Sequence, residues 1–346
     1  MTFPLIPIPK DNPLALSGLL RQAGEVANGI AAKYAFDDYR ARKSVNTIAR
    51  QDNDLALFAA YLRAAGLPVG DFAHDPEAWR GVTWGLVEGF ARWQLGQGYA
   101  VASVNVRLST VKTYTRLALK AGALDSTQYA LIRAVQGYSH REAKRVDEQR
   151  GAGEVPTRKG AKKAKSVSLT KEQAQALKTR PDTPQGRRDS LMMCLLLEHG
   201  LRVGEVARLA VGDFDLKASE LRFYRPKVDK VQVHRLTPDT LRAARIYFQH
   251  DAPALGPVLR ASCKDGSLRA VGMMERAITK RVHDLGQAVG VEGLSAHDCR
   301  HFWATKAARN GTPIDRLQDA GGWASPAMPL RYVEAAKIAN QGVKLD

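Results

Sequence analysis

A histidine and an arginine near the end of the chain are spaced so that they could act together on a phosphate. His297 and Arg300 lie at positions i and i+3, which makes them neighbours on the surface of a helix. Ser295 can cap such a helix, and Asp298 is then the acid of a capping box. The free N–H groups and the dipole of a helix N-terminus favour an anion. The spacing therefore predicts a phosphate site at the start of this helix.

Cleavage of a phosphodiester without a metal ion would need fixed cations around the phosphate. Attack by an oxygen adds a second negative charge in the transition state, and a guanidinium can hold two oxygens while staying charged at any working pH. We expect Arg202 and Arg300 to supply these cations. Glu205 follows Arg202 at i+3. It could form a purely structural ion pair or hold the guanidinium in place for a phosphate, and the two roles are compatible.

The order of several separated motifs resembles the catalytic set of the tyrosine site-specific recombinases, the phage integrase family, in their simpler Cre- or Xer-like layout. The motifs lie between Gly200 and Tyr332, and the family's general layout covers nearly the whole chain. Two departures stand out. Trp323 occupies a position where many members carry His, and Gly321-Gly322-Trp323 replaces the usual Leu-Gly-His. In chain order the set is Arg202, a hairpin lysine, His297, Arg300, Trp323 and Tyr332.

The resemblance implies a role for each aromatic residue of the set. Tyr332 is the nucleophile, and because a phenol with a pKa of about 10 is mostly protonated at neutral pH, it needs a cationic pocket or a base. His297 either takes that proton or binds a phosphate oxygen, and the sequence leaves both roles open. Trp323 either donates its indole N–H to a phosphate oxygen or packs in the core.

A lysine on a hairpin can protonate the leaving 5′-oxygen. Lys227, directly after Arg225-Pro226, fits the family's hairpin lysine best, and Lys230 is the alternative.

The resemblance also implies a reaction. Tyr332 would cleave double-stranded DNA at inverted-repeat sites through a 3′-phosphotyrosyl intermediate, and a homotetramer would exchange strands through a Holliday junction, without metal, ATP or another cofactor. Integration, excision, dimer resolution and transposition all stay open, as does the need for accessory proteins. One alternative is a type IB topoisomerase, where a Lys typically stands in place of His297. Another is a DNA-binding protein with an inactive site, which the complete motif set disfavours.

One histidine pair resembles a zinc site only superficially. His297 and His301 have the spacing of the His-x-x-x-His pair of zinc proteases. Asp298 stands where those enzymes have the catalytic Glu, no third ligand is evident, and Arg300 between the histidines would repel a cation. We therefore predict no metal site and expect His301 to contact neighbouring helices.

The composition indicates a nucleic acid partner. The chain has 346 residues, with 52 Lys and Arg against 35 Asp and Glu, for a net charge of +17. Such an excess of positive charge attracts a polyanion, and charge alone does not separate DNA from RNA or an anionic membrane. The few, widely spaced cysteines fit a reducing cytoplasm. We expect no membrane segment and no signal peptide, because no apolar run is long enough and the N-terminus lacks a basic region before its short apolar stretch.

The residue pattern predicts a mainly helical protein: a helical, SAM-like core-binding domain and a mostly α catalytic domain with a small antiparallel sheet. We expect an N-terminal arm over 1–33, the core DNA-binding domain over 34–138, a basic interdomain linker over 139–168 and the catalytic domain over 169–346. Its end, 333–346, would dock on a neighbouring subunit or pack in cis.

Local signals place the main elements. In the first domain, Ser44 starts a helix that ends before Gly66, a second helix runs from about Thr83 to Gly96, and a third begins after Ser103. In the second domain, Thr170 and Gln173 form a capping box for a helix to Lys178. A buried helix runs from Arg187 to His199 and ends at Gly200. Two alternating segments, 220–224 and 231–236, predict a hairpin.

The third helix mixes bases with small hydrogen-bonding side chains. Such a mixture suits a helix that lies against DNA, where Lys and Arg contact phosphates and Asn, Ser or Thr reach base edges; a plain solvated face is the alternative. The predicted DNA-binding residues, including those of the linker, are Arg50, Asn105, Arg107, Lys112, Arg116, Lys159, Lys162 and Lys163.

Overall fold

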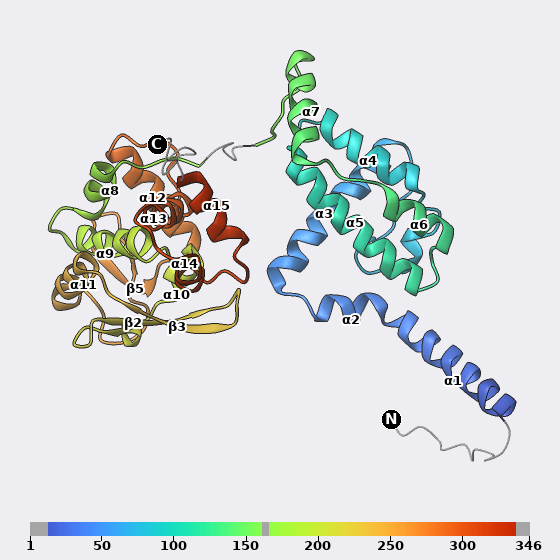
Figure 1. Cartoon of the computed structure of the whole chain (residues 1–346), viewed down its shortest axis with the longest axis horizontal. Coiled ribbons are helices and arrows are strands. Elements are labelled where there is room, and N and C mark those ends of the chain that lie inside the picture. Colours follow the sequence, from blue (N-terminus) through green and yellow to red (C-terminus); the bar gives the residue numbers. More distant parts are fainter. Residues whose placement is uncertain (1–12, 161–165, 337–346) are drawn as a thin grey trace, which may run out of the picture. The chain divides into compact units, whose positions relative to one another are not determined.

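The computed structural model describes residues 13–160 and 166–336, which fall into two compact units (Figure 1). The first unit ends at Lys162 and the second begins at Lys163, so the division lies within the segment predicted as a linker. No helix among the described residues is both long enough and apolar enough to cross a membrane.

The first unit is entirely helical. Its core is aromatic: Phe58 packs against Phe72, Trp79 and Phe90, and the indole of Trp79 donates to the Phe72 carbonyl oxygen at 3.0 Å. Helix α5 contacts α2, α3, α4, α6 and α7 and so runs through the centre of the unit. The elements are α1 (Pro13–Lys33), α2 (Ala35–Ala41), α3 (Val45–Ala64), a 3-10 helix (Pro76–Trp79), α4 (Trp84–Gly96), α5 (Val101–Lys120), α6 (Ser126–Ala134) and α7 (His140–Ala152).

Helices α3 and α5 of the first unit differ in how closely their starts match the prediction. The Ser44 side chain accepts a hydrogen bond from the Thr47 amide at 3.3 Å and caps α3, as predicted. Helix α5 begins earlier than expected, at Val101, because Ala100 takes the extended N-cap conformation before it.

Helix α7 occupies much of the segment for which a flexible linker was expected. Ser139 and Glu142 form a capping box at its start. At its end, the buried guanidinium of Arg150 donates to Asp147 and to the Pro156 carbonyl oxygen. The density of charge in this segment predicted a solvated chain, but the local capping and this one anchored arginine are enough to order a helix.

The second unit combines helices with two small antiparallel sheets, which confirms the predicted fold class. The three-stranded sheet has the order β1-β2-β3, and β4 pairs with β5. The elements are α8 (Lys171–Lys178), α9 (Pro184–Glu198), α10 (Val203–Arg208), a 3-10 helix (Val211–Asp213), β1 (Phe214–Asp215), β2 (Glu220–Arg225), β3 (Lys230–Arg235), α11 (Pro238–His250), β4 (Arg260–Ser262), β5 (Leu268–Gly272), α12 (Glu275–Ala288), α13 (Ala296–Arg309), α14 (Ile314–Gly321) and α15 (Ala327–Ala336).

Helix α9 forms the centre of the second unit. Every residue from Leu191 to Leu197 is buried, and α8, α11 and α13 all pack against the helix. Gly200 follows with a φ of +59°, and a Cβ atom there would lie 2.2 Å from the Trp303 ring. Only glycine fits this turn, which leads directly into Arg202 at the N-cap of α10.

Candidate active site

The predicted catalytic residues come from five separate segments of the second unit. Arg202 and Glu205 belong to the start of α10, and Lys227 lies in the turn between β2 and β3. His297 and Arg300 are on α13, whose start has the predicted capping box of Ser295 and Asp298. Trp323 follows α14, and Tyr332 is on α15. The fold brings Arg202, Glu205, Arg300, Trp323 and Tyr332 into one connected site.

Glu205 is the only carboxylate that the described residues place between the arginines of this site. Its Oε1 atom accepts from Nη1 of Arg202 at 2.8 Å, and its Oε2 atom accepts from the Arg202 backbone N–H at 2.8 Å. The Glu205 side chain is buried, whereas that of Arg202 is a quarter exposed. Glu205 thus holds the Arg202 guanidinium in an ion pair, and its support of a phosphate contact stays a prediction.

Arg300 is almost completely buried against the turn that precedes Trp323. It donates to the carbonyl oxygens of Gly200 and Gly321, and its guanidinium carbon lies 4.5 Å from the centre of the Trp323 ring. Burial, followed by the positive charges of Arg202 and Arg225, lowers its pKa to about 9. A bound anion would act in the opposite direction and raise this pKa.

A third guanidinium, Arg225, was not predicted for the site. It is fully buried and donates to Glu205 and to the carbonyl oxygens of Gly321 and Ala320. Burial lowers its pKa to about 10, with Arg202 acting in the same direction. A signal was present in the sequence, because Arg225 continues the alternation of the buried residues Leu221 and Phe223 along β2. An arginine in phase with apolar residues of a strand indicates a buried charge with partners.

The Gly-Gly-Trp turn departs from the family pattern for a steric reason. A Cβ atom on Gly321 would lie 2.0 Å from the Trp323 ring, so the leucine usual at this position would collide with the indole. Gly322 ends α14 in the left-handed conformation, and a Cβ atom there would lie 2.5 Å from Cδ of Arg225. Tryptophan at 323 and glycine at 321 are therefore a matched pair.

Tyr332 lies in an aromatic pocket with its hydroxyl buried. The side chain is 4% exposed, and among the described residues its Oη atom has no hydrogen-bond partner. The ring centre is 5.6 Å from that of Trp323 and 5.1 Å from that of His301. Burial raises the pKa of the phenol, while Arg300 and Arg202 act to lower it. In this arrangement the hydroxyl is protonated and shielded.

His297 and His301 contact each other on α13. Their Nε2 atoms are 3.0 Å apart, and their rings meet edge to face at 4.5 Å. Because His301 also packs on Tyr332, it connects His297 with the phenol, a connection that the sequence did not predict. No group of three or more metal-ligating side chains occurs in the described part of the chain.

Lys227 and Lys230 both line a pocket of about 540 Å³ next to Gly322 and Trp323. Lys230 is held in a 2.7 Å ion pair with Asp319. Lys227 is exposed at the tip of the hairpin and has no hydrogen-bond or ion-pair partner among residues 13–160 and 166–336. Lys227 therefore stays the predicted donor for a leaving group, and Lys230 stays the alternative.

Residues 167–338 match the model of the phage integrase family. The chain belongs to this family. It is 27% identical to tyrosine recombinase XerD of Neisseria meningitidis over 177 residues, and that match spans 51% of this chain and about 60% of the length of the relative. It is 26% identical to tyrosine recombinase XerC of Pelobacter propionicus over 85% of this chain and 86% of that relative.

Solved structures share the fold of this phage integrase family member. A lambda integrase dimer bound to a COC′ core site superposes with a TM-score of 0.59 at 14% identity, covering 90% of this chain and 95% of that one. The Tn1549 transposon integrase in complex with transposon right end DNA gives a TM-score of 0.58 at 13% identity, covering 87% and 94%.

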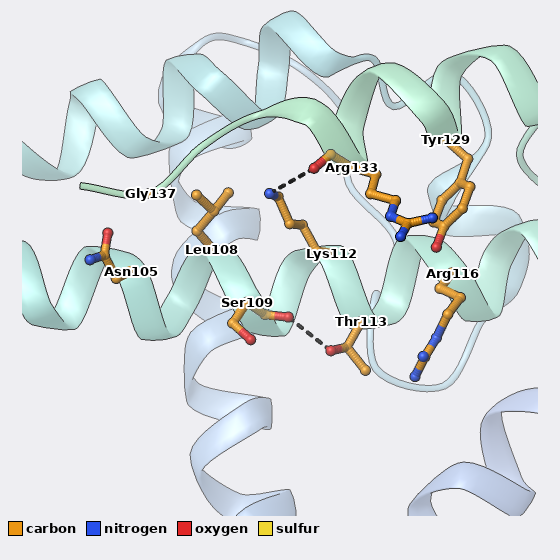
Figure 2. Close-up of a pocket in the computed structure, with 9 residues that line it drawn as sticks. All are labelled: Asn105, Leu108, Ser109, Lys112, Thr113, Arg116, Tyr129, Arg133 and Gly137. Atoms are coloured by element: carbon orange, nitrogen blue, oxygen red, sulfur yellow. Dashed lines mark hydrogen bonds between the residues drawn. The ribbon is translucent and has the colours of Figure 1, made fainter. Parts of the chain in front are cut away.

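Most residues predicted to bind DNA in the first unit of the chain have partners within the fold. The Asn105 amide is bonded to the backbone of Tyr138 in both directions, at 2.7 and 2.8 Å. Lys112 donates to the carbonyl oxygen of Arg133 (Figure 2) and also to that of Val135. In this structure the segment after α6 uses the polar atoms of the Asn105 amide, and a contact of Asn105 with a base edge stays a prediction.

The other predicted bases divide into paired and accessible residues. Arg50 is paired with Asp54 and donates to Thr110. Arg107 donates to Gln94 at 3.1 Å and lies over one side of the Tyr99 ring, which Lys159 also contacts. Arg116 is exposed and lines a groove of about 400 Å³ (Figure 2). Lys162 and Lys163 lie outside the described residues.

Proposed function

We propose that this integrase family member is a site-specific recombinase that breaks and rejoins DNA through Tyr332. The observation that carries the proposal is the convergence of the Arg202 and Arg300 guanidiniums on one turn beside the tyrosine ring. Such a pair can hold the two non-bridging oxygens of a phosphodiester without a metal ion.

The cleavage step follows from these groups. The Tyr332 oxygen attacks the phosphorus, a phosphotyrosyl bond to the 3′ end forms, and the bond to the 5′-oxygen breaks. The phenol proton passes to His297, either directly or through His301, whose Nε2 atom is 3.0 Å away. Lys227 protonates the leaving 5′-oxygen, and Trp323 covers the phosphate. Rejoining is the reverse reaction with the 5′-hydroxyl of a partner strand.

DNA binding has to free the nucleophile. The Tyr332 side chain is 4% exposed and its pKa is raised by burial, so the phenol is inactive in the free protein. A phosphate that engages Arg202 and Arg300 would release their bonds to the carbonyl oxygens of Gly322 and Gly321. We propose that this exchange frees α15, which follows the turn, enough for Tyr332 to reach the phosphorus.

The accessible face of α5 is the proposed DNA contact of the first unit. Side chains at alternating spacings of four and three residues point away from the core along the whole helix, with small side chains first and bases last. A stripe of this kind can enter a groove, with methyl and hydroxyl groups near base edges and bases on phosphates. The residues are Ala102, Val106, Ser109, Thr113, Arg116 and Lys120.

We further propose that residues 34–138 clasp the duplex and that 139–168 include the connection to the catalytic domain at 169–346. Four copies of the chain would then assemble on two inverted-repeat sites. The tail at 333–346 would then dock on a neighbouring copy; its part from 337 onward lies outside the described residues. DNA-bound dimers of the lambda integrase support assembly on DNA. A reducing cytoplasm is the proposed location, which the few, widely spaced cysteines support.

The deciding experiment uses a DNA duplex whose sequence is taken from beside the gene. The duplex contains an inverted repeat and has a nick near its centre. Wild type and Tyr332→Phe are incubated with it in the presence of EDTA, and covalent adducts are resolved in SDS. An adduct formed by wild type alone supports the proposed nucleophile and a metal-free reaction. Binding without an adduct, repeated on a Holliday junction, would leave only a DNA-binding protein. Relaxation of supercoiled plasmid without recombinant products would indicate a topoisomerase.

A further inference from the structure

We infer that Arg225 is a positioning residue for the phosphate-binding side of the site, where it holds Glu205 and the turn that carries Trp323 during cleavage. The inference rests on the proposed recombinase function. Arg225 is the last residue of β2 and pairs with Lys230 of β3, two residues before Lys227. Its side chain is fully buried, so in this structure it cannot contact DNA itself.

The guanidinium of Arg225 caps the C-terminal end of α14. Its Nη2 atom donates to the Ala320 carbonyl oxygen at 2.8 Å, and its Nη1 atom donates to that of Gly321 at 3.0 Å. The last carbonyl groups of a helix have no partner within the helix, and they form the negative end of its dipole. A buried cation at this point stabilises the helix end and thereby fixes where the turn to Trp323 begins.

The same guanidinium reaches the carboxylate that orients Arg202. Nη1 of Arg225 lies 3.2 Å from Oε2 of Glu205, while Nη1 of Arg202 lies 2.8 Å from Oε1. Glu205 therefore bridges the two arginines. Removal of Arg225 would leave the buried carboxylate with only its two bonds to Arg202, and its burial prevents water from replacing the lost cation.

Arg225 differs from the two arginines predicted to bind phosphate, Arg202 and Arg300, in what happens when a phosphate binds. Arg202 and Arg300 donate to the carbonyl oxygens of Gly322 and Gly321 in the free protein, and a phosphate would compete for these donors. Arg225 has no such alternative acceptor, because it is enclosed behind the turn; a Cβ atom on Gly322 would lie 2.5 Å from its Cδ atom. It therefore keeps the turn in place while the other two engage DNA.

The hairpin supplies the rigid base from which Arg225 acts. On β3, Lys230 pairs with Asp319 at 2.7 Å, and the amide of Gln232 donates to the Asp319 carbonyl oxygen at 2.6 Å. These two contacts tie the hairpin to the end of α14 from the opposite strand. Only Arg225 extends the connection to Glu205.

The test replaces Arg225 by methionine, which keeps much of the volume and removes every hydrogen bond. Single-turnover adduct formation is measured on the nicked duplex, and DNA affinity is measured in parallel. We expect affinity to change by less than about twofold and the adduct rate constant to fall roughly 10- to 100-fold, since a misplacement of about 1 Å at a reacting centre costs about that much. Wild type must form the adduct first; without it the proposed function fails, whatever Arg225 does.

A second substrate separates the phosphate side from the leaving group. With sulfur in place of the bridging 5′-oxygen, the leaving thiolate needs no proton, because a thiol has a pKa of about 8.5. Lys227→Ala should recover nearly full cleavage on this substrate, whereas Arg225→Met should keep its loss. Full recovery of Arg225→Met would overturn the assignment to the phosphate side.

Arg188 offers a matched control in the same unit. It is also buried and is paired with Asp189, and it donates to the Arg260 carbonyl oxygen at 2.8 Å, away from the catalytic residues. Arg188→Met should lower the melting temperature but leave the adduct rate of the folded protein unchanged. If it slows cleavage as much as Arg225→Met does, the role of Arg225 is merely structural.

A conservative variant keeps the test decisive if Arg225→Met does not fold. Arg225→Lys retains the charge beside Glu205, but one ammonium cannot replace a planar fork that spans a carboxylate and two carbonyl oxygens. We expect it to fold and to lose roughly 5- to 20-fold in adduct rate, an intermediate share of the loss expected at a misplaced reacting centre. A wild-type rate for Arg225→Lys would overturn the inference.

Discussion

Replacing Gly321 by alanine would place a Cβ atom 2.0 Å from Cζ3 and 2.2 Å from Cε3 of the Trp323 ring. Carbon atoms normally approach no closer than about 3.5 Å, so the indole would have to move by about 1.5 Å. The backbone of Gly321 itself is an ordinary helical end, where alanine is favoured over glycine by about 0.5–1 kcal/mol. The substitution therefore acts on the position of Trp323 and not on the helix.

The expected consequence is a loss of cleavage that depends on the indole. A shift of this size beside a reacting phosphate should lower the single-turnover adduct rate roughly 10²-fold, and the overpacking should cost about 1–3 kcal/mol of stability. The assay is adduct formation on the nicked duplex, with melting measured for each variant. Gly96→Ala is the matched control, because Gly96 also ends a helix and a Cβ atom added there would have no neighbour within 4 Å among the described residues.

The reasoning is tested most strictly in a second background. Trp323→His removes the part of the ring that meets the new methyl group, so Gly321→Ala should change the rate of that variant by less than about threefold, giving a large coupling between the two positions. If Gly321→Ala lowers the adduct rate equally in wild type and in Trp323→His, the steric explanation is refuted. It is also refuted if Gly321→Ala leaves the adduct rate of wild type unchanged.

Three further outcomes follow from the site, the core of the second unit and the α5 surface. Lys227→Ala should slow cleavage by about 10²–10⁴-fold. Lys230→Ala should have a small effect, because it removes only an exposed ion pair worth at most about 1 kcal/mol. A larger loss of rate in Lys230→Ala than in Lys227→Ala would instead identify Lys230 as the general acid. Burial lowers the pKa of His199 to about 4 and that of His234 to about 3. As the pH falls, these histidines take up protons in the unfolded chain before they do so in the folded protein. The free energy of unfolding should therefore be at its full value above about pH 6.5 and fall as the pH drops toward 4, by about 3 kcal/mol per histidine at most. Equilibrium unfolding across this range should show less acid sensitivity in His234→Phe than in wild type, and an unchanged profile would contradict this explanation. Arg116→Ala should weaken DNA binding at all sequences and lower the slope of log affinity against log salt by about one, whereas an unchanged slope would remove Arg116 from the phosphate contacts.

Local patterns in the sequence determined the elements and their chemical character. The capping pairs Thr170 with Gln173 and Ser295 with Asp298 start their helices as predicted, and the alternation along β2 and β3 predicted the hairpin. These signals work because a cap or a strand period is complete within a few residues. The order of the chemically distinctive residues was likewise enough to predict the family.

Only the tertiary structure decided which of these groups are free to act. Arg225 meets the Ala320 carbonyl oxygen 95 positions away in the chain, Asn105 and Lys112 bond to the backbone of the segment after α6, and Tyr332 is enclosed by Trp323 and His301. A side chain's type fixes the bonds that it can make, but its partner is set by packing between distant elements. Burial then determines its charge and reach, and no local pattern contains that information.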